Sequence, residues 1–406
     1  MTYPHASFAI TDDVKEEKVR LIYHGDTTDV EILKNYYSFQ SPLYHDARMP
    51  AFTLVSPNRK VALGIAGYVR LALAQDFNGS IPNRDFIPYQ IPRAGSGSQS
   101  SRLFMDPTSS TVNIQLFAET RFGLLQGSIQ TNFRGSDDAN KQQKAYLQLG
   151  NVLIGSAWSI LADLDCYPTS VDTQGPNAFW GITTYQISYL DSINRHITYG
   201  VSLEVPAYSI ADSLSRSSAS QMIPSVPFYF SYHGKWGHVR FGSLLRTLRY
   251  KNLDNGDMQY LLTWGAALSA HVQPVSPLTI YLQTSFAKGA SEYFADLKDN
   301  GMDLLPNPDA PGKLRPVPCW GYYFGIDYVI SKKIRVSSIF SNLRVYRGDF
   351  EDLSIYRIGR YFTASLYYKI LPQLEWSFEY ERGYREDQNF CYGRANRLQT
   401  AFRYDF

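Results

Sequence analysis

The sequence has no run of about 18 consecutive apolar residues, so it holds no candidate for a membrane-spanning helix. Its three cysteines, Cys166, Cys319 and Cys391, lie far apart and fit no metal-binding spacing; one disulfide would leave the third as a free thiol. The net charge is +2 without a cluster of Lys and Arg, so we expect no nucleic-acid partner. The seven histidines are scattered, and the HExxH, CxxC, GxSxG and Walker patterns are absent. We therefore predict no catalytic residue, no metal site and no cofactor.

Aromatic residues, in contrast, are plentiful: 31 Tyr, 23 Phe and 6 Trp make up 15% of the chain. Such enrichment is typical of the aromatic girdles that flank the apolar band of a membrane β-barrel. The mean hydropathy is nevertheless negative, at -0.27. A water-filled barrel reconciles the two observations, because alternate side chains of each strand face its lumen.

The stretch from Arg397 to Phe406 alternates strictly between polar and apolar residues. This period of two predicts a strand with one wet face and one apolar face. No later residue covers the apolar face, whereas a strand that closes a transmembrane barrel presents that face to lipid. The aromatic last residue also resembles the C-terminal signal of bacterial outer-membrane barrels. The apolar face holds Leu398, Thr400, Phe402, Tyr404 and Phe406, and the wet face holds Arg397, Gln399, Ala401, Arg403 and Asp405.

The same alternation runs through the chain after residue 60. About seven short connections alternate with about eight long ones, which is the layout of a porin with short periplasmic turns and long extracellular loops. A soluble propeller or multi-sandwich would instead repeat a motif every ~40–50 residues, and none is found. We therefore predict an all-β fold, a transmembrane antiparallel β-barrel of about 16 strands with an aqueous lumen. The predicted strands are 61–75, 111–121, 125–134, 144–149, 152–158, 179–189, 195–205, 227–233, 238–250, 259–271, 278–288, 320–330, 334–347, 357–370, 373–384 and a closing strand within 391–406.

The third long connection, 159–177, is the best candidate for a pore constriction. It carries Asp163, Asp165 and Asp172, whose charges are suited to a wet lumen and would be costly against lipid. Acids opposite arginines across a narrow gap would create a transverse field that sorts solutes by charge. The plainer interpretation is that each of these residues is a solvated lumen side chain. The predicted inward-facing cations are Arg70, Arg240, Arg246 and Arg397 near mid-strand, with Lys144 and Arg134 nearer the loops.

Three segments carry a resemblance to a known family. They are Ala145–Asn177 (AYLQLGNVLIGSAWSILADLDCYPTSVDTQGPN), the entry strand Gly64–Phe77 (GIAGYVRLALAQDF) and the terminal FRYDF. Together they resemble trimeric outer-membrane porins of Gram-negative bacteria, and among these they are most similar to the DcaP-like porins. The resemblance covers about Ala51 to Phe406. It implies a homotrimer, an inward-folded third loop and passage of small, often anionic solutes. It also maps Asp163, Asp165, Asp172 and Arg70 onto the constriction.

We divide the chain into an N-terminal periplasmic segment, 1–60, and a transmembrane barrel, 61–406. Asp29 can cap a short helix over 30–39 in the first segment. The start of the chain lacks the charged and apolar parts of a signal peptide, so export would require that the signal peptide has been removed from this sequence.

Two expectations concern strand register. The closing strand should pair with 61–75 and bring Arg70 next to Arg397. In 334–347 the register stays open, because Ile339 and Leu343 fall on the nominal wet face of that strand and a slip of one residue exchanges lumen for lipid.

The function expected from these features is that of an outer-membrane porin and not of an enzyme. It would be a channel for passive diffusion of small hydrophilic solutes, set in lipid and lipopolysaccharide. One alternative is a substrate-selective channel, in which the arginines form a ladder that binds dicarboxylates or phosphate-like anions. A barrel enzyme such as a lipid hydrolase is a third hypothesis. It would need a Ser and a His on the outer wall, where the assigned positions are almost wholly apolar.

Overall fold

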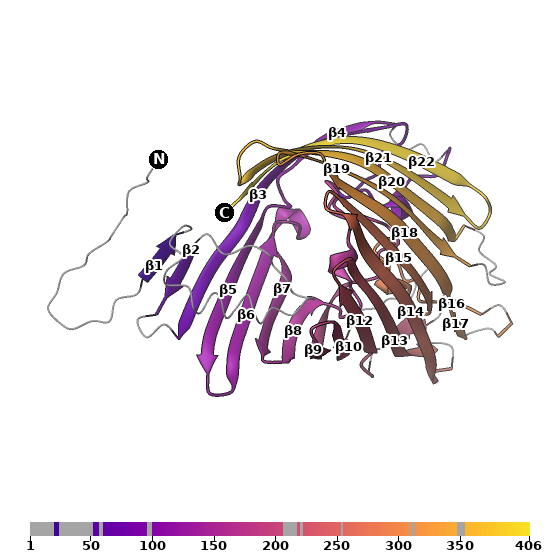
Figure 1. Cartoon of the computed structure of the whole chain (residues 1–406). Coiled ribbons are helices and arrows are strands. Elements are labelled where there is room, and N and C mark those ends of the chain that lie inside the picture. Colours follow the sequence, from indigo (N-terminus) through magenta and orange to yellow (C-terminus); the bar gives the residue numbers. More distant parts are fainter. Residues whose placement is uncertain are drawn as a thin grey trace.

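In the computed structural model, sixteen of the described strands close into an antiparallel β-barrel (Figure 1). The structure describes residues 20–23, 52–56, 60–95, 100–205, 217–219, 222–252, 255–307, 309–310, 313–346 and 354–406, with the backbone alone for 20–23 and 217–219. No helix among these residues is long and apolar enough to cross a membrane. The wall strands are β3 (Val61–Phe77), β5 (Thr111–Thr120), β6 (Gly123–Asn132), β7 (Lys141–Leu149), β8 (Val152–Trp158), β9 (Thr183–Asn194), β10 (Ile197–Val205), β12 (Val226–Gly234), β13 (Gly237–Asn252), β14 (Met258–Val275), β15 (Leu278–Lys288), β18 (Pro318–Val329), β19 (Ile334–Val345), β20 (Tyr356–Lys369), β21 (Leu374–Asp387) and β22 (Tyr392–Asp405).

The two faces of each wall strand differ as the sequence alternation predicts. On β14, Leu262 and Leu268 point outward with 73% and 50% of their surface exposed, whereas Thr263 and Ser269 point inward and are buried. A continuous band of exposed apolar side chains is unfavourable in water. It is typical of the lipid-facing surface of a membrane barrel. The predicted fold class and its sixteen strands are confirmed.

The closing strand pairs with the first wall strand, but in a different register from the one predicted. Arg70 lies opposite Arg403, and Arg397 lies opposite Asp76. The expectation that Arg70 and Arg397 are neighbours is wrong, because a period of two fixes the face of a residue and not its height along the barrel. The barrel closes on Phe406, whose backbone exchanges two hydrogen bonds with Gly67. A Cβ at Gly67 would lie 2.3 Å from the carbonyl oxygen of Thr111, so only glycine fits there.

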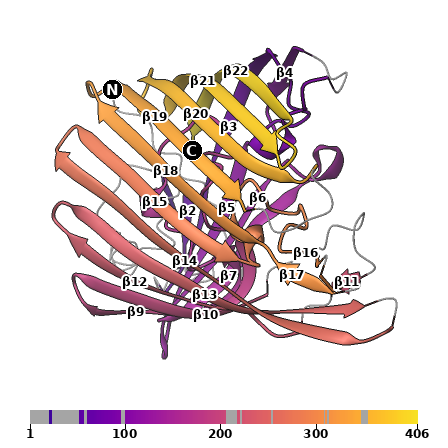
Figure 2. The same cartoon turned by 90° about the vertical axis from the view of Figure 1, so that its right-hand side faces the viewer.

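Six short strands lie outside the sixteen. β2 (Phe52–Val55) pairs with the start of β3, beyond the end of β22, and β1 (Arg20–Tyr23) pairs with β2. Near the long-loop end, β4 (Arg102–Asp106) continues the line of β5 along β3. There too, β11 (Ser217–Ala219) pairs with β13, and β16 (Leu304–Pro306) pairs with β17 (Leu314–Pro316) (Figure 2). The helix predicted over 30–39 lies outside the described residues.

Apolar side chains of the long loops fill part of the barrel interior. Trp180, Tyr293 and Phe294 form a buried cluster with wall residues that include Leu343. Ile339 packs in a second cluster with Ile81, Phe86, Ile91, Tyr361 and Ala395. The pairing of β19 with both neighbours shows no register shift. Ile339 and Leu343 therefore face inward because loops cover them, and not because the strand slips.

Two further expectations change in detail. The strand predicted to start at residue 179 starts at Thr183, because Phe179 and Trp180 are buried in the loop cluster before the chain reaches the wall. Cys166, Cys319 and Cys391 are all free thiols, so the disulfide considered above does not form.

Candidate functional site: the third loop and its wall contacts

The third long loop, L3 (residues 159–182), leaves β8 and crosses the interior before it joins β9 (Figure 1). It contains one turn of 3-10 helix, Leu164–Cys166. The Cys166 thiol lies 3.0 Å from the carbonyl oxygens of Ala270 and Leu282, on β14 and β15. The Asp172 amide donates to Glu379 on β21 at 2.8 Å. L3 thus contacts wall strands far from its own, and the predicted inward-folded loop is confirmed.

The first acid of L3, Asp163, is pressed against the wall instead of facing it across a gap. His238 Nε2 lies 2.8 Å from Asp163 Oδ2, Ser269 donates to the same oxygen, and Arg240 Nη1 lies 3.8 Å from Asp163 Oδ1. Burial by itself would raise the pKa of Asp163, but Arg240 and His238 outweigh it and hold this pKa well below its usual range. Asp163 is therefore a buried anion that anchors L3 to β13 and β14.

The last acid of L3, Asp172, sits in a different environment. Its Oδ1 accepts from the Phe86 amide at 3.1 Å and its Oδ2 from the Tyr361 hydroxyl at 3.2 Å. Burial, followed by the neighbouring Asp85 and Glu379, raises the pKa of Asp172 to about 7. Asp172 is thus poised to change its protonation state near neutral pH.

Glu379 holds the loop backbone around Asp172. Its carboxylate accepts from the amides of Val171 and Asp172, both at 2.8 Å, and from the Ser170 hydroxyl. Hydrogen bonds to a charged acceptor are stronger than neutral ones, so this carboxylate is a main attachment point of L3.

Arg70, on β3, contacts the same stretch of L3. Its Nη2 donates to the Val171 carbonyl at 2.7 Å and its Nη1 to Ser109 Oγ at 2.9 Å. An arginine side chain stays charged at any physiological pH. Arg70 is therefore a fixed positive charge beneath L3.

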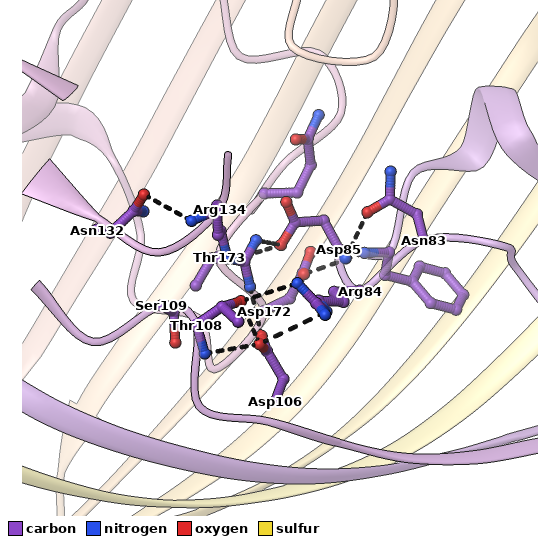
Figure 3. A network of polar contacts seen from close by, with 12 residues as sticks. Asn83, Arg84, Asp85, Asp106, Thr108, Ser109, Asn132, Arg134, Asp172 and Thr173 are labelled. Atoms are coloured by element: carbon purple, nitrogen blue, oxygen red, sulfur yellow. Dashed lines mark hydrogen bonds and ion pairs between the residues drawn. The ribbon is translucent and has the colours of Figure 1, made fainter. Parts of the chain in front are cut away.

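A polar network joins L3 to the first long loop, L1 (residues 78–101) (Figure 3). Arg134, at the end of β6, bridges Asp85 of L1 and Asp106 of β4, with 2.7 Å between its Nη2 and Asp106 Oδ2. Thr173 of L3 donates to Asp85, and Arg84 Nε lies 3.8 Å from Asp106 Oδ1. The carboxylates of Asp85 and Asp106 therefore link L1 to L3 and to Arg134.

Arg397 and Arg246 also form ion pairs with carboxylates. Arg397 Nε lies 2.6 Å from Asp76 Oδ1, and its Nη1 donates to the Arg84 carbonyl of L1 at 2.7 Å. Arg246 Nη1 lies 2.6 Å from Asp303 Oδ2, on the sixth long loop, L6 (residues 289–317). Arg246 thus secures L6 and not L3.

The seven residues predicted for the constriction fall into separate groups. Asp163, Asp165 and Arg240 lie together at β13. The carboxylate of Asp165 is close to the carboxylate of Asp163 and to the imidazole of His238. Asp172 lies within electrostatic reach of both Arg70 and Arg397. Arg246 stands apart with Asp303. Among the described residues, Asp163, Asp165 and His238 form the one group that could hold a metal ion.

Several residues that contact the loops were not among the predicted constriction residues. His238, Glu379 and Asp76 all lie on inward strand positions, so alternation alone could have placed them in the lumen. The alternation could not show which of these side chains contact L1 and L3. Glu381 is a further case: it is fully buried, and neither carboxylate oxygen has a hydrogen-bond partner.

Comparison with known proteins agrees with this architecture. Residues 55–304 match the family model described as DcaP outer membrane protein. The outer membrane channel DcaP of Acinetobacter baumannii superimposes with a TM-score of 0.76 at 16% identity, over 86% of this chain and 98% of that chain. The anion-selective porin from Comamonas acidovorans gives 0.59 at 10% identity, over 86% and 100%. The trimer form of OmpT from Vibrio cholerae gives 0.55 at 11%, over 86% and 100%. No curated protein sequence matches the chain. Because the family model spans more than half of its length, the chain belongs to the DcaP outer membrane protein family, and its place is the Gram-negative outer membrane.

Proposed function

We propose that this outer-membrane porin passes small hydrophilic anions by diffusion, that it works as a homotrimer, and that L3 and its wall contacts form the constriction. No covalent step enters the proposal. Selection would come from the width left beside L3 and from the charges that reach the water of the pore.

The observation that carries anion preference is the uneven exposure of the ion pairs. Arg335 and Arg403 point into the lumen near the short turns, with 33% and 35% of their side chains exposed. Their partners Glu375 and Asp405 are each 24% exposed. The loop acids Asp163 and Asp172 are buried, so they present little negative charge to the water of the pore. The charge that meets a solute is then more positive than the near-neutral composition suggests.

The homotrimer is supported by the uneven height of the wall. β8 has 7 residues and β7 has 9, against 16 in β13 and 18 in β14. Seven residues rise ~23 Å along the strand, and less once the strand is tilted, whereas the apolar band of an outer-membrane barrel is ~25 Å tall. The outward face of this low wall includes the apolar residues Leu147 and Ile154, which are both more than half exposed. A second copy of the chain would cover them.

A substrate-selective channel is the alternative. A ladder built from Arg70, Arg240, Arg246 and Arg397 has little support, because each guanidinium already binds protein acceptors. A different feature favours selectivity: a cavity of about 400 Å³ between L3 and L6, lined by Trp158, Tyr167, Phe179 and Lys298 among others. Saturable block of conductance by a dicarboxylate, lost in K298Q, would support this alternative.

Planar-bilayer recording tests the main proposal. The purified protein should give stepwise ohmic conductance, in groups of three for a trimer, and its reversal potential in a KCl gradient should show anion preference. R335E and R403E should shift that potential toward the cation value. R360E is the matched control, since Arg360 lies on the outward face of β20 and its charge change leaves the lumen untouched. A cation-selective wild type would refute anion preference, and absence of conductance would refute the pore.

A further inference from the structure

Three histidines form a row on the inner wall near the short-turn end of the barrel. His233 on β12 pairs with His238 on β13, and His238 pairs with His271 on β14. The ring centroids are 5.3 Å apart for the first pair and 4.6 Å for the second. Residues that seem unrelated along the chain thus form one patch of imidazoles, the histidine row.

L3 places two carboxylates against this row. One ligand atom each from Asp163, Asp165 and His238 lies within 4.8 Å of the other two. Ligand atoms of a tetrahedral zinc site lie about 3.4 Å apart, given bonds of about 2.1 Å. The three side chains are therefore near the spacing of a metal site, and metal binding would require them to rotate toward one shared ion.

Several atoms at this point are buried and have no hydrogen-bond partner. They are Asp163 Oδ1, His238 Nδ1 and His271 Nδ1. Asp163 and His238 are each only 1% exposed. Buried polar atoms in folded proteins are nearly always satisfied, so the three unpaired atoms need an explanation. A bound cation would provide one, because oxygen and imidazole nitrogen are both metal ligands.

The local charge is compatible with a cation. Two carboxylates face one guanidinium, that of Arg240, which donates to Ser231 Oγ at 2.7 Å and reaches Asp163 only at 3.8 Å. Mixed imidazole and carboxylate ligands suit Zn²⁺, Ni²⁺ or Cu²⁺, whereas Mg²⁺ and Ca²⁺ prefer oxygen alone. We propose that the histidine row and the two L3 acids, Asp163 and Asp165, bind a divalent transition-metal ion and that this ion ties L3 to β13 and β14.

The consequence for the channel is a loop held at one position. With the ion bound, the first half of L3 would be cross-linked to the wall, and the pore beside it would keep one width. Without the ion, protein contacts alone hold that half, among them the hydrogen bonds of Asp163 and the contacts of the Cys166 thiol with β14 and β15. The effect on conductance rests on the proposed pore function, but metal binding does not.

Co²⁺ replaces Zn²⁺ as a spectroscopic probe in the test. The full-length protein in detergent, freed of metal by a chelator, is titrated with Co²⁺ and its visible absorption is recorded. We expect saturation at one ion per chain and an affinity at least ~10-fold lower in D165N and in H271Q. H196Q is the matched control: His196 is a fourth imidazole near the row, but it lies in the β9–β10 turn with its Nδ1 2.8 Å from the His233 carbonyl oxygen. Far-UV circular dichroism confirms that each variant is folded.

The outcomes are distinct. Saturable binding that D165N and H271Q weaken and H196Q preserves supports the site. A wild type with no saturable Co²⁺ absorption, or variants that bind as tightly as the wild type, overturns it. Bilayer conductance is measured in parallel with chelator and with Zn²⁺. Failure of the metal-free protein to conduct would refute the pore and leave the Co²⁺ result to decide the metal site.

Discussion

Raising the pH should loosen the docking of L3 at Asp172. The pKa of this carboxyl is about 7 in the folded protein, and we take the ordinary value of an aspartate, 3.8, for the unfolded chain. A raised pKa means that the folded state binds the proton more tightly than the unfolded state does. The contribution of protonated Asp172 to stability is therefore complete below pH 3.8 and is lost as the pH rises through 7. The total loss is at most about 4 kcal/mol, of which about 2 kcal/mol falls between pH 5 and pH 7.

The structure explains why the ionised form is unfavourable. The negative charges of Asp85 of L1 and Glu379 of β21 disfavour ionisation of Asp172, and the positive charge of Arg397 favours it. Ionisation of Asp172 would add a negative charge among buried acids. It would weaken the segment that Glu379 holds through the amides of Val171 and Asp172.

Hydrogen exchange followed by mass spectrometry measures this directly. After correction for the intrinsic rate, the opening free energy of the amides at 170–175 should fall by roughly 2 kcal/mol between pH 5 and pH 7. D172N should give a flat profile, and D137N, which changes an exposed acid of the second long loop, should follow the wild type. A flat profile in the wild type, or an unchanged slope in D172N, would refute the assignment of the effect to Asp172.

Three other substitutions test the packing. L268K places a cation on the outward face near the middle of β14 and should destabilise the barrel by about 2–4 kcal/mol, measured by urea unfolding in lipid vesicles; an unchanged midpoint would contradict a lipid-facing position. R246M leaves Asp303 buried without its cation and should cost about 3–5 kcal/mol of L6 docking, seen as faster hydrogen exchange in that loop, whereas unchanged exchange would mean that the pair does not hold L6. I339A removes a side chain from the cluster that Ile339 forms with Ile81, Phe86 and Ile91 of L1, and it should cost about 2–5 kcal/mol in the same unfolding assay; a loss near zero would show that L1 does not pack there.

The sequence by itself determined the wall of this protein. A period of two decides which side chains face lipid, and breaks in that period mark the turns, so all sixteen strands could be found, although some of their bounds differ by several residues, as at Thr183–Asn194. Both signals are local and need no knowledge of what lies across the barrel. Even Ile339 and Leu343, which looked misplaced, followed the alternation.

Only the tertiary structure decided what fills the lumen and at which height the residues meet. Arg397 pairs with Asp76 and not with Arg70, because the stagger of the strands at closure leaves no trace in local alternation. Glu379 holds the amide of a residue 207 positions earlier, and three scattered histidines become one row. Such contacts depend on the path of long loops through the interior, which is set by complementarity between distant segments and not by any repeat in the sequence.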